Sequence, residues 1–450
     1  MAAFASLPIE LQYQCVQYFD IETLKQFRLA SRKASLIGKE YLFDTVVLTF
    51  DESSAESFNH VLEDDALRAI VKKVIVDDTE GNMENEFLND EYDEEEEAYV
   101  HQATPWSNAI SKMAQFPNLR DAEIWFCEEC VDTDFTGECL QDPEYRELYQ
   151  NRFFEALKDA QGVQSLTLKN MQDMIVTTTG SEEAIEAVRG RLKRFAILVA
   201  TEDCDAAPEH QIESEELHSC FNSLLKVHWL NPLQTQLTHL TVYSDFEWGI
   251  FPFMDVREIH FPNLVSLALG KWTVAHDWQF DWITSHGATL EELILDDVAI
   301  SYIMWMEDEM VEANWPDMRP WKGRDTVKLY STRWHEVFPK FQQQLPKLRH
   351  FRTEHEGWQT FSRRYDLLAR IKRPRYTLFN GACWDDNADR STYRNEDKVK
   401  IAVDHPGADQ EKKDHEALKN LLKSLGKTEE EIENMRDLEW NDDEKRWDFY

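Results

Sequence analysis

A short unit recurs along the middle of this 450-residue chain: an apolar residue, two polar residues, a second apolar residue, and then a strand-like run. One such strand and its return segment cannot bury their apolar side alone, so neighbouring units have to stack. The recurrence therefore predicts an α/β fold with a parallel sheet of stacked units. The predicted strands are 121–126, 167–168, 196–199, 241–243, 265–269, 294–297 and 349–352.

The spacing of the clearest units narrows the fold further. Leu240, Leu267 and Leu293 follow one another at intervals of 27 and 26 residues, within the period of roughly 20–29 residues of leucine-rich repeats. The units resemble irregular leucine-rich repeats, which implies a solenoid with parallel strands on its concave face. Longer gaps elsewhere predict insertions, and an ordinary α/β sheet stays open as the alternative. Return helices are predicted at 143–160, 180–190 and 278–286.

The residues from Leu7 to Val47 carry a helical pattern instead. Pro8 fixes a turn before the first helical run. Asp20 is the predicted N-cap of a second run, with Thr23 as the competing candidate. A third run spans residues 31–42. Three short helices in about forty residues make a small core, so part of their apolar surface is expected to need a partner.

This N-terminal stretch resembles the F-box, in the form common in fungal proteins. The matching residues are Leu7-Pro8, Glu10-Leu11, Val16, Tyr18-Phe19-Asp20, Leu24, Arg28-Leu29, Ser31-Arg32 and Leu42 to Val46. The resemblance implies a non-catalytic substrate receptor of a Skp–cullin–F-box ubiquitin ligase. Its partners would be the Skp adaptor, the cullin and RING subunits reached through it, and a target protein. The residues that the resemblance assigns to adaptor contact are Leu7, Pro8, Leu11, Val16, Phe19, Leu24, Leu29 and Ser31.

These patterns divide the chain into three parts. Residues 1–47 are the F-box-like domain, 48–385 the repeat region, and 386–450 a charged tail with short helices at 415–425 and 428–435. The repeat region begins with strands at 42–50 and 71–76 around a helix at 55–70. It contains an acidic insertion at about 77–100, predicted to be disordered, and an insertion rich in Trp and Met at 301–340.

The composition excludes several partners and compartments. A net charge of −38 argues against nucleic acid and against an anionic membrane surface. No apolar run approaches the roughly twenty residues that a spanning helix needs, and the N-terminus has no signal-peptide pattern. Seven scattered cysteines are typical of reduced thiols, so we expect the protein in the cytosol or the nucleus.

No motif predicts catalysis, a cofactor or a metal. Cys127, Cys130 and Cys139 supply half of a zinc-site spacing without a nearby histidine. The chain has neither a glycine-rich phosphate loop nor a nucleophile elbow. The acidic pairs Asp296-Asp297 and Asp385-Asp386 are predicted to be solvated surface, so we expect a protein that is not an enzyme.

Two other classes of function stay open. The first is an acidic scaffold or chaperone for basic proteins, which would use the strip from Asp77 to Glu97 and act independently of a ligase. The second is a hydrolase or metal enzyme, which no motif supports. The target of a receptor and the repeat residues that bind it are not determined by these patterns.

Overall fold

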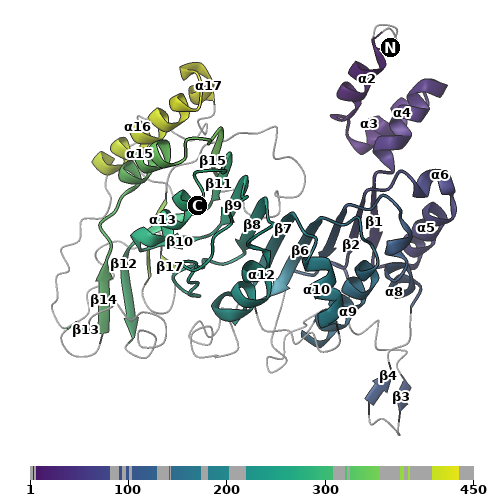
Figure 1. The fold of residues 1–450 in the computed structure, drawn as a ribbon, viewed down its shortest axis with the longest axis horizontal. Coiled ribbons are helices and arrows are strands. Elements are labelled where there is room, and N and C mark those ends of the chain that lie inside the picture. Colours follow the sequence, from purple (N-terminus) through teal and green to yellow (C-terminus); the bar gives the residue numbers. More distant parts are fainter. Residues whose placement is uncertain are drawn as a thin grey trace. The chain divides into compact units, whose positions relative to one another are not determined.

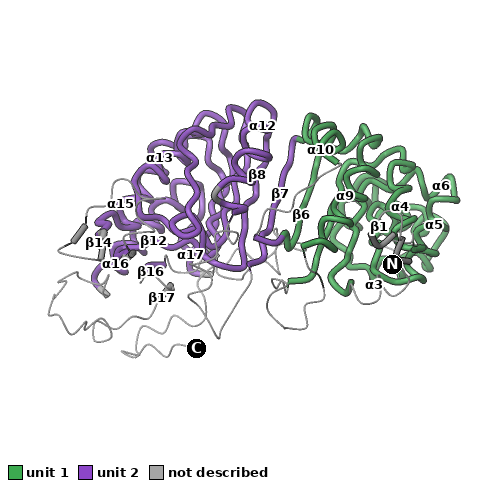
Figure 2. The backbone as a smooth tube through the Cα atoms, turned by 90° about the horizontal axis from the view of Figure 1, so that it is seen from below, with its two compact units in different colours: residues 1–171, 176–192 green, residues 172–175, 193–450 purple. Residues whose placement is uncertain are grey.

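The computed structural model is an α/β protein with mostly parallel strands in its main sheet (Figure 1). It comprises two compact units: unit 1 holds residues 1–171 and 176–192, and unit 2 holds residues 172–175 and 193–450 (Figure 2). The residues that the structure describes are 4, 7–81, 91–93, 98–100, 104–128, 141, 143–173, 181–201, 219–307, 320–321, 325–354, 375–379, 384–385 and 408–434.

Unit 1 begins with three short helices, α2 (Ile9–Val16), α3 (Ile21–Arg28) and α4 (Arg32–Leu42). The Asp20 carboxylate caps α3 by accepting a hydrogen bond from the Thr23 amide at 2.6 Å, so Asp20 is confirmed as the N-cap and Thr23 is not. The Ser31 hydroxyl caps α4 in the same way, at 3.0 Å from the Ala34 amide. The predicted three-helix module is therefore confirmed. Side chains cap the starts of α3 and α4, whereas α2 begins after Pro8 without a side-chain capping hydrogen bond.

Four parallel strands follow in unit 1: β1 (Thr45–Thr49), β2 (Lys73–Asp77), β5 (Asp121–Trp125) and β6 (Ser165–Gln172). The helix predicted at 55–70 is divided in two, α5 (Glu52–Glu63) and α6 (Asp65–Arg68), because the Asp64 side chain caps a new helix by accepting from the Ala66 and Leu67 amides. The other helices of unit 1 are α8 (Pro105–Ile110), η1 (Met113–Gln115), α9 (Pro143–Lys158) and α10 (Glu182–Arg189).

Helix α10 occupies the predicted return segment, but its N-cap differs from the prediction. Ser181 precedes the helix and makes no side-chain capping hydrogen bond. Its backbone has φ −109° and ψ 11°, outside the extended conformation that lets an N-cap side chain reach the amides of the first turn.

Five parallel strands form the main sheet of unit 2: β7 (Arg194–Ala200), β8 (His239–Ser244), β9 (Ser266–Gly270), β11 (Glu292–Asp296) and β15 (His350–Glu354). Between them lie the π-helix η2 (Cys220–Leu230) and the helices α12 (Asn231–Leu233), α13 (Asp277–Ser285) and α15 (Trp334–Gln344). All seven strands predicted from the recurring unit are present.

The recurring unit is repeated in three dimensions as well as in sequence. Leu240, Leu267 and Leu293 are register partners on adjacent strands, and each is fully buried. The Thr238 carbonyl accepts from two successive amides of the next unit, those of Val265 and Ser266. The carbonyl at the matching position of the following unit, Val265, accepts from the Glu291 and Glu292 amides. The same backbone contact thus joins each unit to the next.

The sequence Phe-Pro-Asn-Leu occurs at 116–119 and again at 261–264, and its two copies supply a matching side-chain contact. Asn118 donates to the Ala69 carbonyl at 2.8 Å, and Asn263 donates to the Thr235 carbonyl at 2.9 Å. In both motifs the amide reaches back to the turn of the preceding unit. The asparagine of this motif is therefore a link between neighbouring units.

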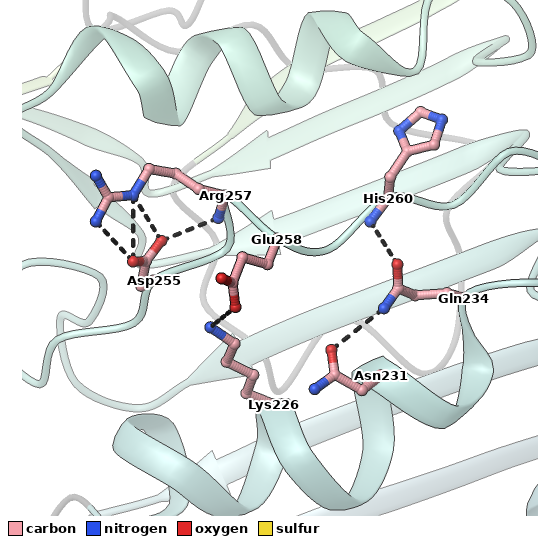
Figure 3. A network of polar contacts seen from close by, with 7 residues as sticks. All are labelled: Lys226, Asn231, Gln234, Asp255, Arg257, Glu258 and His260. Atoms are coloured by element: carbon pink, nitrogen blue, oxygen red, sulfur yellow. Dashed lines mark hydrogen bonds and ion pairs between the residues drawn. The ribbon is translucent and has the colours of Figure 1, made fainter.

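A polar network secures the turn before the second of these motifs (Figure 3). The Asp255 carboxylate accepts from the Arg257 side chain at 2.7–3.1 Å, and Lys226 of η2 lies 3.5 Å from Glu258. The Gln234 side chain accepts from the His260 amide at 2.9 Å. These contacts hold the loop 255–260 against η2 and α12.

Part of the predicted Trp- and Met-rich insertion at 301–340 forms secondary structure, while residues 308–319 and 322–324 lie outside the described residues. It contributes to a second sheet in unit 2, made of β10 (Thr273–Val274), β12 (Ala299–Glu307), β13 (Pro320–Trp321), β14 (Asp325–Leu329), β16 (Arg375–Phe379) and β17 (Trp384–Asp385). Long runs without the recurring unit hid these strands, because β12 pairs with β16 across more than seventy residues of chain.

Part of the predicted disordered acidic insertion also forms strands. Two short strands, β3 (Glu91–Asp93) and β4 (Ala98–Val100), pair antiparallel, and Asp77 is the last residue of β2. Residues 82–90 and 94–97 lie outside the described residues.

The tail contains the two predicted helices, α16 (Ala408–Ser424) and α17 (Glu429–Asn434). Helix α16 begins seven residues earlier than predicted and packs on α15. Its Asp414 is only 2% exposed; its carboxylate accepts from the His335 amide at 2.8 Å and from the Tyr376 hydroxyl at 2.7 Å. One buried carboxylate therefore joins the tail to α15 and β16.

Replacing Asp414 with alanine is expected to detach α16 from unit 2. The substitution leaves the Tyr376 hydroxyl and the His335 amide without this acceptor, at a cost of about 1–3 kcal/mol for each buried group. Limited proteolysis should then cleave within 408–434 at least tenfold faster than in the wild type. The exposed Asp409 on the same helix is the control, and an Asp409→Ala variant that is cleaved as fast would contradict the assignment.

Among the described residues, no helix combines the length and the apolar character that crossing a membrane requires.

Candidate functional site: the exposed apolar residues of the N-terminal helices

The three N-terminal helices share a small core of their own. Val16, Leu24 and Ile37, one from each helix, are buried and in contact. Phe19 and Phe27 pack edge to face at 5.5 Å against this cluster. Helices α3 and α4 approach closely because Gly38 has no side chain; a Cβ there would lie 2.6 Å from the Arg28 side chain.

The outer surface of these helices is unusually apolar. Nine large hydrophobic side chains are exposed among the described residues, and seven of them lie between Ile9 and Val47. Such side chains are normally scattered singly, so their concentration in one short stretch indicates an interaction site. We call these seven residues the exposed apolar set: Ile9, Leu11, Tyr18, Ile21, Leu29, Leu36 and Val47.

Leu29 and Leu11 show how much binding energy the set can supply. Leu29, the C-cap of α3, is 81% exposed, and Leu11 on α2 is 42% exposed. Fully burying a leucine side chain contributes about 1.5–3 kcal/mol. Several such residues are enough to drive association of short helices with a partner, after the cost of immobilising the two proteins is met.

The charge of this stretch is also distinct from the rest of the chain. Residues 1–47 contain five basic and five acidic side chains, so they are neutral overall and the remaining residues carry the whole net charge of −38. A neutral apolar surface on a strongly acidic protein favours a partner recognised through hydrophobic contact, because net charge contributes little to association there.

The connection to the sheet is short and tied down. Only Phe43 and Asp44 separate α4 from β1. The Asp44 carbonyl accepts from the Lys72 and Lys73 amides at 2.8 and 2.9 Å, and burial raises the pKa of the Asp44 carboxyl group. The chain therefore enters the sheet directly from the last N-terminal helix.

The structure divides the eight residues predicted for adaptor contact into three groups. Pro8, Leu11, Leu29 and Ser31 are exposed, and Leu7 and Phe19 are half-buried. Val16 and Leu24 belong to the core of the helices and shape the surface from beneath. The residues predicted for adaptor contact did not include the exposed Ile9, Ile21 and Leu36 on these helices, nor the exposed Tyr18 in the turn after α2.

A signal for the missed residues is present in the sequence. Leu36 directly precedes the buried Ile37, and adjacent helical positions point about 100° apart. An apolar residue that lies out of phase with the buried face of its own helix therefore indicates an exposed position. Tyr18 directly follows Gln17, the C-cap of α2, and Ile21 directly follows Asp20, the N-cap of α3.

The other candidate residues have structural roles or lie outside the described residues. Cys127 is buried and its amide donates to the Gln141 side chain at 2.9 Å, while Cys130 and Cys139 are not among the described residues.

Asp296 accepts from the Tyr243 hydroxyl at 2.8 Å, and Asp297 pairs with Arg375. Asp385 is the last residue of β17, and Asp386 lies outside the described residues. The described part of the chain contains no group of three His, Cys, Asp or Glu side chains placed to hold a metal ion.

Fold and surface together define a class: an α/β protein with parallel repeated strands, preceded by a helical module that exposes apolar side chains. The chain matches no family model, and no curated protein is found as a relative.

Proposed function

We propose that the protein is the substrate receptor of a Skp–cullin–F-box ubiquitin ligase. The helices α2–α4 would bind the Skp adaptor, and the strand region would bind a target protein. The observation that carries the proposal is the exposed apolar set: of the nine exposed large hydrophobic residues in the described part of the chain, seven lie within the stretch that resembles the F-box. Such a receptor would act in the cytosol or the nucleus.

The chemistry of such a receptor is proximity rather than catalysis. Holding a target next to a ubiquitin-charged enzyme raises the effective concentration of the two reactants. This role needs a defined distance between the adaptor and the target. The two-residue connection between α4 and β1, with its two hydrogen bonds to the Asp44 carbonyl, supports such a rigid link.

We also infer that the strand region is an irregular leucine-rich-repeat-like solenoid. The register shared by Leu240, Leu267 and Leu293 supports this fold, as does the repeated pair of backbone hydrogen bonds between units. An ordinary open α/β sheet does not require the same side-chain position and the same backbone contact to recur in each unit.

Adaptor binding tests the proposal directly. A Leu11→Asp, Leu29→Asp double variant is expected to lose at least about a hundredfold in affinity for the purified Skp adaptor, because two apolar contacts are replaced by charges. Isothermal titration measures the effect. Val227, a third exposed aliphatic residue, lies on η2 in unit 2, and a Val227→Asp variant is the matched control with unchanged binding.

Two results would refute the proposal: a wild-type chain that does not bind the adaptor, or a double variant that binds as tightly as the Val227→Asp control. Circular dichroism of each variant separates loss of binding from loss of folding. Both mutated positions are exposed, so the helices are expected to remain folded.

An acidic scaffold for basic proteins is the second candidate. The net charge of −38, carried entirely outside residues 1–47, favours it. A scaffold would retain its basic partners after deletion of residues 1–47 and would release them in moderate salt, which screens exposed charges.

A further inference from the structure

The charges of the N-terminal helices are segregated although their sum is zero. Residues 25–39 contain five basic side chains and no acidic one, and the five acidic side chains of residues 1–47 lie before or after this range. The range runs from α3 through the turn into α4. One local stretch is therefore basic on a chain whose net charge is −38. We call it the basic stretch; its charged members are Lys25, Arg28, Arg32, Lys33 and Lys39.

Two of these cations, Arg32 and Lys33, are exposed and have no partner in the described part of the chain. Among the described residues, neither side chain takes part in an ion pair or a hydrogen bond. Lys25, by contrast, pairs with Glu22 at 2.6 Å. Arg32 and Lys33 are therefore the members of the basic stretch whose charge is most available to another molecule.

The position of these two cations is unfavourable for their own helix. Arg32 and Lys33 are the first two residues of α4, directly after the N-cap Ser31, and the first turn of α4 contains no acidic side chain. A cation at a helix N-terminus is repelled by the positive end of the helix dipole. Helices α3 and α5 carry Glu22 and Glu52 in their first turns instead. Charges that oppose the stability of their helix and pair with no described neighbour indicate a role in binding.

The same short segment carries two of the most exposed apolar residues. Leu36 is 67% exposed and lies four residues after Arg32 and three after Lys33, the separations at which side chains are neighbours on a helix surface. Leu29 is 81% exposed and lies in the turn that leads into α4. Two exposed leucines thus flank the two cations along the chain.

We propose that the Skp adaptor meets this surface with carboxylates, which pair with Arg32 and Lys33 beside the apolar contacts of Leu29 and Leu36. Carboxylates are the side-chain groups that pair with both a guanidinium and an ammonium group. The remainder of the chain is acidic and repels an acidic partner, so a local basic stretch would direct such a partner to α4 during association. This inference rests on the proposed receptor function, because it names the charge of the partner at the same site.

Charge reversal tests the pairing. An Arg32→Glu, Lys33→Glu variant of the full chain is expected to bind the purified Skp adaptor about tenfold more weakly in about 0.15 M salt, mainly through slower association. Surface plasmon resonance measures both rates. The matched control is Lys193→Glu with Arg194→Glu, a second pair of adjacent exposed cations, which lies in unit 2. It changes the net charge equally and should change the association rate less than about twofold.

Hydrogen exchange separates loss of binding from loss of structure. The charge reversal replaces two cations at the N-terminus of α4 by acids, so amide exchange within α4 is expected to slow about twofold to fivefold. A purely structural role of Arg32 and Lys33 would give faster exchange together with weaker binding, and that result would overturn the proposal. An Arg32→Gln, Lys33→Gln variant should lie between the wild type and the charge reversal in both measurements.

The remaining outcomes separate this inference from the proposed function. Equal weakening by the two charge reversals would show a general charge effect and overturn the inference. If the Arg32 and Lys33 variant binds the adaptor normally while the Leu11 and Leu29 variant does not, only the acidic contact falls and the receptor function stands. A wild-type chain that does not bind the adaptor refutes both. If that chain instead binds a fluorescent duplex DNA through Arg32 and Lys33, the partner of the basic stretch is a nucleic acid.

Discussion

Replacing Arg146 with methionine is expected to lower the free energy of unfolding of unit 1 by about 4 kcal/mol. Arg146 on α9 is 1% exposed. Its guanidinium donates to the carbonyls of Cys127 at 2.9 Å and of Gln141 at 3.3 Å, and also to that of Asn170. Methionine matches the length of the stem but leaves these buried carbonyls without their charged donor, and an unsatisfied buried acceptor costs about 1–3 kcal/mol.

Urea unfolding followed by circular dichroism measures this loss, with Lys158→Met as the control on the same helix. The Lys158 side chain is 38% exposed and pairs at 3.4 Å with Glu183, whose side chain is 89% exposed, so its replacement should change the unfolding free energy by less than about 0.5 kcal/mol. Equal stability of the two variants would contradict the role assigned to Arg146. Arg146→Lys should fall between the wild type and Arg146→Met, because one ammonium group reaches fewer of the three carbonyls.

Arg146 also shows where sequence reasoning ends. The period of the recurring unit predicted the strands of the main sheet, because the same buried position, as at Leu240 and Leu267, repeats along the chain. Contacts between distant segments do not leave such a period. Arg146 bonds to the carbonyl of Cys127, just after β5, and to that of Asn170, within β6. A basic residue within a helical run is otherwise read as surface.

The second sheet was missed for a related reason. β12 and β16 are adjacent and parallel, but the residues between them include the long helix α15 and segments without the recurring unit. Local patterns indicate an alternating strand but not its partner, because pairing depends on the whole chain. The Trp- and Met-rich composition of 301–340 therefore suggested an insertion instead of a sheet.

The candidate site was predictable in position but not in detail. The stretch that resembles the F-box placed the expected contacts within residues 7–47, and the cap at Asp20 followed from known capping preferences, whereas the cap at Ser31 was not predicted. Which apolar residues face outward depends on how three short helices rotate against one another. Val16 and Leu24 were expected at the interface but form the core, whereas Ile21 and Leu36 lie outside.

Replacing Asp245 with asparagine is expected to stabilise unit 2 at pH 7 by about 2–3 kcal/mol. Burial raises the pKa of Asp245 from its ordinary 3.8 to about 6, although its carboxylate accepts from the Thr201 amide at 2.9 Å. Because the folded pKa lies above the unfolded one, the stability that the protonated group contributes is lost as the pH rises from about 4 to 6. Asparagine can accept the same hydrogen bond and never ionises, so that loss should disappear.

His286 makes the test sharper because it acts with the opposite sign. Burial lowers the pKa of His286 from 6.5 to about 4, and its Nε2 accepts from the Phe261 amide at 3.2 Å, which requires the neutral ring. A lowered histidine pKa gives stability that is present above pH 6.5 and is lost as the pH falls towards 4. In the wild type the contributions of Asp245 and His286 oppose each other across this range, so removing one of them should change the slope of stability against pH.

In the Asp245→Asn variant the contribution of Asp245 is absent, so stability should rise between pH 4 and pH 6.5 by about 2–3 kcal/mol more than in the wild type. Urea unfolding of unit 2 at intervals across this range measures the slope. Asp281→Asn is the control, because Asp281 is 60% exposed in its ion pair with Lys340 and its replacement should leave the profile of the wild type. A variant profile with the same slope as that of the wild type would mean that Asp245 does not ionise unfavourably at the end of β8. Asparagine could take the place of a buried acid that costs stability at neutral pH, with little change in structure. A steeper profile in the Asp245→Asn variant would therefore indicate that the acid is present for a reason other than stability. It makes the ends of the unit 2 strands the next place to look for function.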